Sequence, residues 1–212
     1  MARNVGPKCR LCRREGIKLF LKGGRCHGAK CAISRRGDTQ APGTQGTKNA
    51  KKSSEYGLQL REKQRLKRMA GLLERQFRTI FARAQRQRGN TGTVLIDLVQ
   101  RRLDHVLRMS GFGHGPASAR QIIVHGLVFL NGHRADRPSM LVNAGDVITF
   151  TQREKARTLI KNVLETTKGY QQVPGWLERD ETNLAVKVLN LPARDEYPFE
   201  IRAQLIVEGA SK

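Results

Sequence analysis

The sequence predicts an α+β protein, in which a basic, cysteine-stapled N-terminal arm and a helical domain precede a small helix-helix-strand module with a short mixed β-sheet. Apolar residues recur at helical spacing through the middle of the chain, and β-rich runs follow them. Four cysteines fall within the glycine-rich, basic beginning. With 212 residues and 38% hydrophobic side chains, the chain can bury one or two modest cores.

The positive charge is concentrated in the first half of the chain. Residues 1–93 carry 24 basic and five acidic side chains, which gives 19 of the 22 net positive charges. Such a polarised field attracts a polyanion, and nucleic acid is the first candidate because each neutralised phosphate releases counterions. The alternative, a basic surface kept for solubility, needs a net charge of only ~2 to 8. No run approaches the ~20 apolar residues of a spanning helix, and the N-terminus has no signal-peptide core, so we expect a cytoplasmic protein.

The cysteines have the spacing of metal ligands. Cys9 and Cys12 form one knuckle, Cys26 and Cys31 a second, and thirteen residues separate them. In a reducing compartment, four thiolates at this spacing predict one closed, structural zinc site with no open position for a reacting water. An iron–sulfur cluster also suits four thiolates, and metal-free cysteines are the third alternative. His27 is adjacent to Cys26, and we interpret it as a bystander.

A loop and a basic helix follow the arm. Residues 36–52 lack an apolar period and predict a linker or an RNA-ordered loop. Ser53 or Ser54 can cap a helix that runs to about Met69. Its apolar contacts are assigned to Tyr56, Leu60 and Leu66. Its basic side chains are Arg61, Lys63, Arg65, Lys67 and Arg68. We expect them to contact RNA; the alternative is a solvated helix face.

Two further helices lead into the module. One runs from about Leu72 to Arg88, and Gly89 ends it. The next opens after residues 91–93, and we expect the N-terminal helices to share an interface with the module. The buried stripe of the first consists of Leu73, Phe77, Ile80, Phe81 and Ala84, and the second contributes Leu95, Leu98 and Val99.

Residues 101–150 form the helix-helix-strand module. Leu103, Val106 and Leu107 predict one short helix, and a second helix is stopped by Gly126. Strands are predicted at VFL and VITF, with a tight turn at Asn131-Gly132 and a polar turn at 134–137.

The remaining chain is predicted to pack on the body. A helix is expected over about 152–168, then short strands, and the tail EIRAQLIVEGASK is predicted to add one more strand. The short strands are indicated by Trp176, Leu177, Leu184, Val186 and Val188. In all, we divide the chain into a cysteine arm (1–45), a helical domain (46–97), the module (98–165) and a C-terminal extension (166–212).

The chain has little that could serve as an active site. Its module histidines have no Ser, Cys or carboxylate partner at catalytic spacing, and a histidine at a helix end is usually a cap or a phosphate contact. Asp104 is interpreted as an ion-pair partner of Arg101 and Arg108. No Walker loop is present, and GFGHG has no strand before it. We therefore predict no enzymatic activity and no small-molecule substrate.

The module resembles a known RNA-binding unit. The order RLD-x-V, SARQII, the HG stop, FLNG and AGDVI is similar to the S-four module, which a ribosomal protein, some tRNA ligases, pseudouridine synthases and a heat-shock protein share. The resemblance implies binding to structured RNA. Gly115 and Pro116 stand where the family usually opens the second helix with Ser-Arg, and Val124 where a basic residue is common.

Over its whole length the sequence resembles the bacterial S-four family of small-subunit ribosomal proteins, in its cysteine-bearing form. The matching motifs are MAR-x-x-GP-x-C-x-LCRREG-x-KL-x-LKG, APG-x-x-G, YG-x-QLREKQ-x-L-x-R, LERQFR, the module and QLIVE. The resemblance implies a protein that binds small-subunit ribosomal RNA, nucleates subunit assembly, contacts neighbouring ribosomal proteins and contributes to translational accuracy. It also implies a position at the messenger RNA entry, for which Lys48, Lys51 and Lys52 match the family's positions.

Charge and resemblance together predict two sets of contact residues, one for ribosomal proteins and one for RNA. Acidic C-terminal residues (Glu178, Asp180, Glu181, Asp195, Glu196, Glu200 and Glu208) are candidate partners for a basic ribosomal protein. The alternative function is that of a zinc-containing RNA-binding regulator, or an accessory of an RNA-modifying enzyme, outside the ribosome. The predicted RNA contacts are Arg3, Lys8, Arg10, Arg13, Arg14, Lys22, Lys30, Arg35, Arg36, Lys48, Lys51, Lys52, Tyr56, Arg61, Lys63, Arg65, Lys67, Arg68, Arg101, Arg102, Arg120 and His125.

Overall fold

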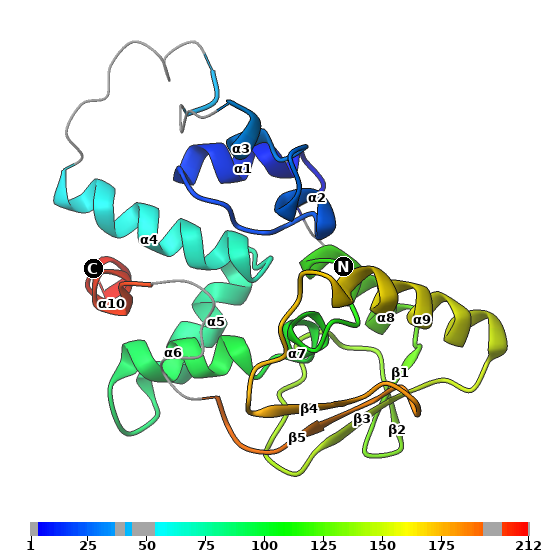
Figure 1. The fold of residues 1–212 in the computed structure, drawn as a ribbon. Helices are drawn as coiled ribbons and strands as arrows, with labels where there is room; N and C mark the ends of the chain where they lie inside the picture. Colours follow the sequence, from blue (N-terminus) through cyan, green and yellow to red (C-terminus); the bar gives the residue numbers. More distant parts are fainter. Residues whose placement is uncertain (1–3, 37–40, 44–53, 193–200, 212) are drawn as a thin grey trace. The chain divides into compact units, whose positions relative to one another are not determined.

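The structure is a computed structural model that describes residues 4–36, 41–43, 54–192 and 201–211. The chain forms two compact units, one of residues 1–96 and 199–212 and the other of residues 97–198 (Figure 1). No helix in the described ranges combines the length and the apolar character needed to cross a membrane. Lys48, Lys51 and Lys52 lie outside the described residues, as does Arg3.

The first unit is helical. Leu19 and Leu21, which follow the first helix in sequence, are buried at 0% and 8% exposure, so the cysteine arm contributes apolar side chains to the interior of its unit. Ser54 accepts a hydrogen bond from the backbone N–H of Gly57, as the predicted cap requires. Its helices are α1 (Lys8–Glu15), α2 (Gly24–His27), α3 (Ala32–Arg36), α4 (Glu55–Met69), α5 (Glu74–Gln85), the first part of α6 (Thr91–Gln100), and α10 (Ala203–Ser211).

The C-terminal segment corrects one prediction. The tail forms the helix α10 rather than an added strand, and it packs along α4 (Figure 1). Ile206 is fully buried, and the side-chain amide of Gln59 on α4 donates a 3.4 Å hydrogen bond to Glu208. Gly209 allows this close approach, because a Cβ there would lie 2.8 Å from the Cβ of Gln59. The two ends of the chain thus build one unit.

The second unit packs helices on a five-stranded sheet with strand order β2-β1-β3-β5-β4. All four strand pairings are antiparallel, so the predicted mixed sheet is wrong. Alternate residues of each strand face the helices, as Ile148 and Val186 do at 0% exposure. Its elements are α7 (Leu103–Met109), α8 (Pro116–Val124), β1 (Val128–Leu130), β2 (His133–Ala135), β3 (Val147–Phe150), α9 (Glu154–Lys168), β4 (Leu177–Asp180) and β5 (Ala185–Val188).

The hairpin of the module has the predicted tight turn. Asn131 and Gly132 both have positive φ angles, of 50° and 81°, which is the backbone of a type I′ turn. The predicted polar turn at 134–137 is wrong in its first half, since Arg134 and Ala135 belong to β2 and pair with β1, whereas Asp136 and Arg137 follow the strand. The register pairs Leu130 with His133 across this turn.

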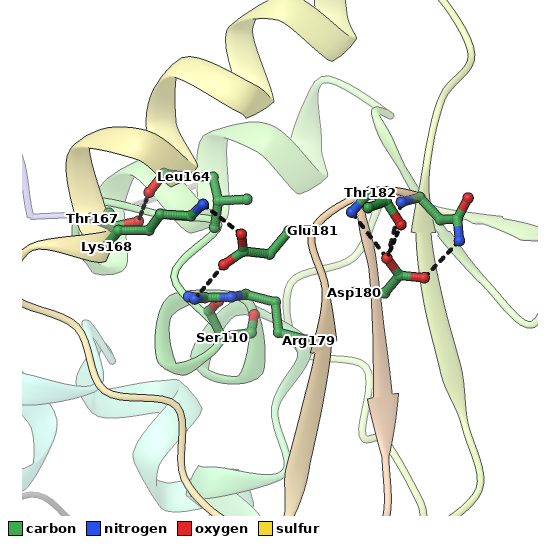
Figure 2. A network of polar contacts seen from close by, with 9 residues as sticks. Ser110, Leu164, Thr167, Lys168, Arg179, Asp180, Glu181 and Thr182 are labelled. Carbon is green, nitrogen blue, oxygen red and sulfur yellow. Dashed lines mark hydrogen bonds and ion pairs between the residues drawn. The ribbon is translucent and has the colours of Figure 1, made fainter.

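Residues from the C-terminal half hold the end of α7 (Figure 2). The hydroxyl of Thr167 on α9 donates a 2.6 Å hydrogen bond to the carbonyl oxygen of Gly111. Arg179 on β4 donates one of 3.3 Å to the carbonyl oxygen of Ser110. Glu181 in turn forms ion pairs with Arg179 and Lys168. The orphan carbonyls at the end of α7 are therefore satisfied by side chains that follow the module in sequence.

Candidate nucleic-acid interface

The four cysteines gather at one place in the first unit. Cys12, Cys26 and Cys31 are buried and Cys9 is half-buried. Burial raises the pKa of the Cys12 thiol, and the charges of Cys26, Cys9 and Cys31 raise it further, while a backbone hydrogen bond to Leu19 opposes the rise. The sulfurs of Cys9, Cys26 and Cys31 therefore lie close enough to Cys12 to affect its pKa.

Backbone amides already point at these sulfurs. The N–H of Lys22 donates a 3.3 Å hydrogen bond to the Sγ of Cys26. Burial would raise the pKa of Cys31, but backbone hydrogen bonds from Ser34 and Ile33 outweigh it, and the pKa is lowered. Within the described ranges, no three His, Cys, Asp or Glu side chains are close enough to hold a metal ion. The predicted bystander His27 is exposed, and its ring lies 4.7 Å from that of Phe20.

A buried carboxylate joins the cysteine-bearing helix α1 to α4. The Glu15 side chain is 1% exposed, and it forms ion pairs with Arg61, at 3.2 Å, and with Arg68. Burial raises the pKa of Glu15, whereas Arg68, Arg61 and Arg65 lower it. These two predicted RNA contacts thus attach α1 to α4.

The other predicted cations of α4 are also paired. Lys63 and Lys67 form ion pairs of 2.7 and 2.5 Å with Glu74, and Arg65 forms one of 2.6 Å with Glu62. Although burial would raise the pKa of Glu74, hydrogen bonds from Lys63 and Lys67 lower it to about 2. The five basic side chains predicted to contact RNA thus each have a carboxylate partner within the unit. Three carboxylates, on α1, α4 and α5, share the five cations, so part of the positive charge of α4 remains.

Tyr56 lies at the other end of α4. The sequence predicts for it both an apolar contact and a contact with RNA, but its side chain is 67% exposed. It is therefore not part of the core, whereas Leu66 on the same helix is fully buried. An exposed aromatic ring remains available for stacking on a base.

Two predicted RNA contacts of the module are buried in its framework. Arg102 binds Asp104 through two hydrogen bonds, of 3.0 and 2.7 Å, and Arg120 lies 3.6 Å from the same carboxylate. The side chains of Arg102 and Arg120 are less than 10% exposed. The predicted partners of Asp104, Arg101 and Arg108, are therefore corrected to Arg102 and Arg120. Helical spacing along α7 alone cannot show which side chain α8 brings to this carboxylate.

Arg101 forms hydrogen bonds within the module, whereas His105 and His125 differ in burial. Arg101 donates hydrogen bonds to the carbonyl oxygen of Val142, at 3.0 Å, and to the side chain of Asn143. His105 is buried, and burial together with Arg108 and Arg102 lowers its pKa to about 3, so it is a neutral core residue. His125 is exposed at the C-terminal end of α8, where it can still meet RNA.

The arm residues that are predicted to contact RNA differ in exposure. Lys8 and Arg13 are half-buried, and the side chain of Arg36 is outside the described part. The exposed predicted cations of the arm are Arg10, Arg14, Lys22, Lys30 and Arg35.

The acidic C-terminal residues predicted to meet a ribosomal protein are only partly described. Glu178 is exposed, Asp180 accepts hydrogen bonds from Thr182 and Asn183, and residues 195, 196 and 200 are not described.

The sequence prediction missed the exposed arginines of α5 and the turn after it. Their signal was present in the sequence, because no acidic residue occurs between Glu74 and Asp97. The predicted stripe of Phe77 and Phe81 defines only the buried side of this helix, and the arginines lie on the other side. These residues are Arg75, Arg78, Arg83, Arg86 and Arg88.

Comparison with known proteins agrees with this arrangement. Residues 3–100 match the ribosomal protein S4/S9 N-terminal domain, and residues 101–148 match the S4 domain. The small ribosomal subunit proteins uS4 of Syntrophus aciditrophicus and Thermus thermophilus are 47% and 43% identical to the chain, and uS4A of Alkaliphilus oremlandii is 50% identical. Each comparison covers the whole of both chains. Full-length identity at this level, with both domains in order, shows that this chain belongs to the uS4 family of small-subunit ribosomal proteins.

Proposed function

We propose that this protein is a structural constituent of the small ribosomal subunit in the cytoplasm and binds small-subunit ribosomal RNA directly. The supporting observation is its full-length similarity to small-subunit proteins. The electrostatics agree, since most of the net charge of +22 lies before residue 94, and exposed arginines occur on the arm and on α5.

The experiment is sedimentation of a tagged chain expressed in bacteria. The chain should travel with small subunits and remain bound after a high-salt wash, because many phosphate contacts and shape recognition hold it. A tagged uS4 relative serves as the positive control. Release of the tagged chain at a salt concentration that leaves the control bound would contradict the proposal.

We further propose that the protein nucleates subunit assembly, lies near the messenger RNA entry and contributes to translational accuracy. The family supports these roles, and Lys48, Lys51 and Lys52 are the residues assigned to the entering message. Replacing all three with Gln should reduce crosslinking of the chain to messenger RNA in assembled subunits without reducing sedimentation with them. Unchanged crosslinking would show that residues other than these three lysines contact the messenger RNA.

We propose that Cys9, Cys12, Cys26 and Cys31 hold one structural zinc ion. Their shared position and the N–H group aimed at Cys26 support this, and an ion would draw the sulfurs together. Metal analysis should find one zinc per chain. Cys12→Ser should loosen the arm and leave the module folded, with Ala29→Ser at an exposed position of the arm as the control. Iron with sulfide would favour a cluster, and absence of metal would leave four free thiols.

A further inference from the structure

Helix α5 buries one side and presents the other. Phe77, Phe81 and Ala84 are buried along one stripe, at 1%, 6% and 0% exposure. The opposite side of the helix is exposed. It consists of residues three or four positions apart, namely Arg75, Thr79, Ala82 and Arg86. The helix is therefore fixed to its unit by an apolar stripe, and its outer face is available to a partner.

The outer face of α5 carries arginines at both ends, with the uncharged Thr79 and Ala82 between them. Arg75 and Arg86 lie on nearly the same line, three turns apart, which is about 16 Å at 1.5 Å per residue. Arg83 flanks this line, and Arg88 follows in the turn after the helix. Of the arginines here, Arg78 has a carboxylate within reach, Glu74 at 3.3 Å. In the part of the chain that the structure describes, Arg75, Arg83, Arg86 and Arg88 have no ion pair.

Helix α4 provides the contrast within the same unit. It has five cations in a row of eight residues, but Glu15, Glu62 and Glu74 bind all of them. Five cations and three carboxylates leave two net positive charges there, and all five cations are held in ion pairs. On α5 and the turn after it, four of the five arginines have no ion pair among the described residues, although the two helices look equally basic in sequence.

Helix stability does not explain the α5 arginines. Cations in the last turn of a helix stabilise it through the macrodipole, which could account for Arg83 and Arg86. The same macrodipole disfavours a cation in the first turn, where Arg75 lies. The presence of exposed arginines at both ends of α5 is better explained by binding of an external anion.

The side-chain chemistry indicates which anion. All cations on this face are arginine, whose planar guanidinium donates paired hydrogen bonds to phosphate oxygens and stays charged under all conditions. A phosphodiester backbone supplies such oxygens at regular intervals along a line. An acidic protein segment would offer carboxylates, but it would need several in one row to match this length.

We propose that the outer face of α5, formed by Arg75, Arg83 and Arg86 with Arg88 beyond it, binds the phosphate backbone of the ribosomal RNA and supplies a larger share of the salt-dependent affinity than α4. This inference rests on the proposed function. The α4 cations support the fold, and the α5 arginines contact the RNA.

The test compares two triple variants of the full chain. One is Arg75→Gln, Arg83→Gln and Arg86→Gln on α5, and the other is Lys63→Gln, Arg65→Gln and Lys67→Gln on α4. Both remove three positive charges from the same unit, so a difference between them reports position rather than net charge. Affinity for small-subunit ribosomal RNA is measured by filter binding at several salt concentrations, and circular dichroism checks that each variant is folded.

The α5 variant should bind at least about tenfold more weakly at low salt, and its slope of log affinity against log salt should fall by about 0.7 to 0.9 for each phosphate that the protein no longer neutralises. The slope of the α4 variant should fall less. A third variant, with lysine at positions 75, 83 and 86, should keep the slope because it keeps the charge.

The outcomes separate this inference from the proposed function. If the unsubstituted chain binds the RNA and the α5 variant keeps its affinity and slope, the inference is overturned and the proposed function stands. Equal weakening in the α4 and α5 variants also overturns it, because net charge would then suffice. The inference is also overturned if the α5 variant binds an acidic ribosomal protein more weakly while its RNA binding is unchanged. Failure of the unsubstituted chain to bind the RNA would remove the proposed function itself.

Discussion

The Oγ of Thr167 on α9 lies 2.6 Å from the carbonyl oxygen of Gly111, 56 residues earlier in the chain. Both residues are buried, so this hydrogen bond fixes the end of α7 from outside the module. The C-terminal extension therefore contributes to the order of the RNA-binding module.

Thr167→Val should destabilise the second unit by about 1–3 kcal/mol, because it leaves a buried carbonyl without its hydrogen-bond donor at nearly constant volume. Trp176 is the single tryptophan and is 4% exposed, so its fluorescence during urea unfolding reports on this unit. Thr166→Val is the matched control, since Thr166 is exposed and bonds within its own helix. Equal effects of the two substitutions would show that the hydrogen bond to Gly111 contributes nothing.

Arg68→Gln should weaken the attachment of α1 to α4 most strongly at neutral pH. It removes the largest attraction that opposes the burial of Glu15, so the pKa of Glu15 should rise further. A carboxyl whose pKa is raised by folding favours the folded state at low pH, and that stability is lost as pH rises through the folded pKa. We expect a loss of about 1–3 kcal/mol at pH 7 and a smaller one near pH 5.

Hydrogen exchange of the α1 and α4 amides measures the Arg68→Gln effect. Arg78→Gln, at an exposed pair on α5, is the control. The double variant Glu15→Gln with Arg68→Gln should recover much of the loss, because no buried charge remains. An equal loss at both pH values would refute the assignment to Glu15.

Glu74 should give the first unit an acid-sensitive component of stability. Its folded pKa of about 2 lies below the ordinary value of 4.5. Such a carboxyl contributes stability that is fully present above the unfolded pKa and is lost as pH falls from about 4.5 to about 2. Glu74→Gln should be less stable than the parent chain at pH 6, and the difference should shrink as the pH approaches 2. Acid titration followed by circular dichroism measures this, and parallel curves would contradict it.

Gly209→Val should displace α10 from α4. A Cβ at this position would lie 2.8 Å from the Cβ of Gln59, so a larger side chain forces the helices apart at a cost of about 1–3 kcal/mol. Protection of α4 amides from hydrogen exchange should fall, while the fluorescence of Trp176 should stay unchanged. Gly169→Ala is the control, because a Cβ there meets nothing within 4 Å.

The sequence by itself determined the features that depend on neighbours in the chain. The side chain of Ser54 caps α4 by accepting a hydrogen bond from the backbone N–H of Gly57. Asn131-Gly132 turns the hairpin with two positive φ angles, and Phe77 and Phe81 mark the buried side of α5. Each requires residues at most a few positions apart. The family motifs are likewise read directly from residue order, which is why the family could be predicted before the structure was considered.

Tertiary structure alone decided which charges remain available and what the tail becomes. Glu15 meets Arg61 and Arg68 from 46 and 53 residues away, and Asp104 receives Arg120 from a second helix. The tail QLIV fits a short strand or a helix by pattern, and packing of Ile206 against the first unit selects the helix. The physical reason is that charge neutralisation and burial depend on distance in space, which residue order does not specify for segments that meet only after folding.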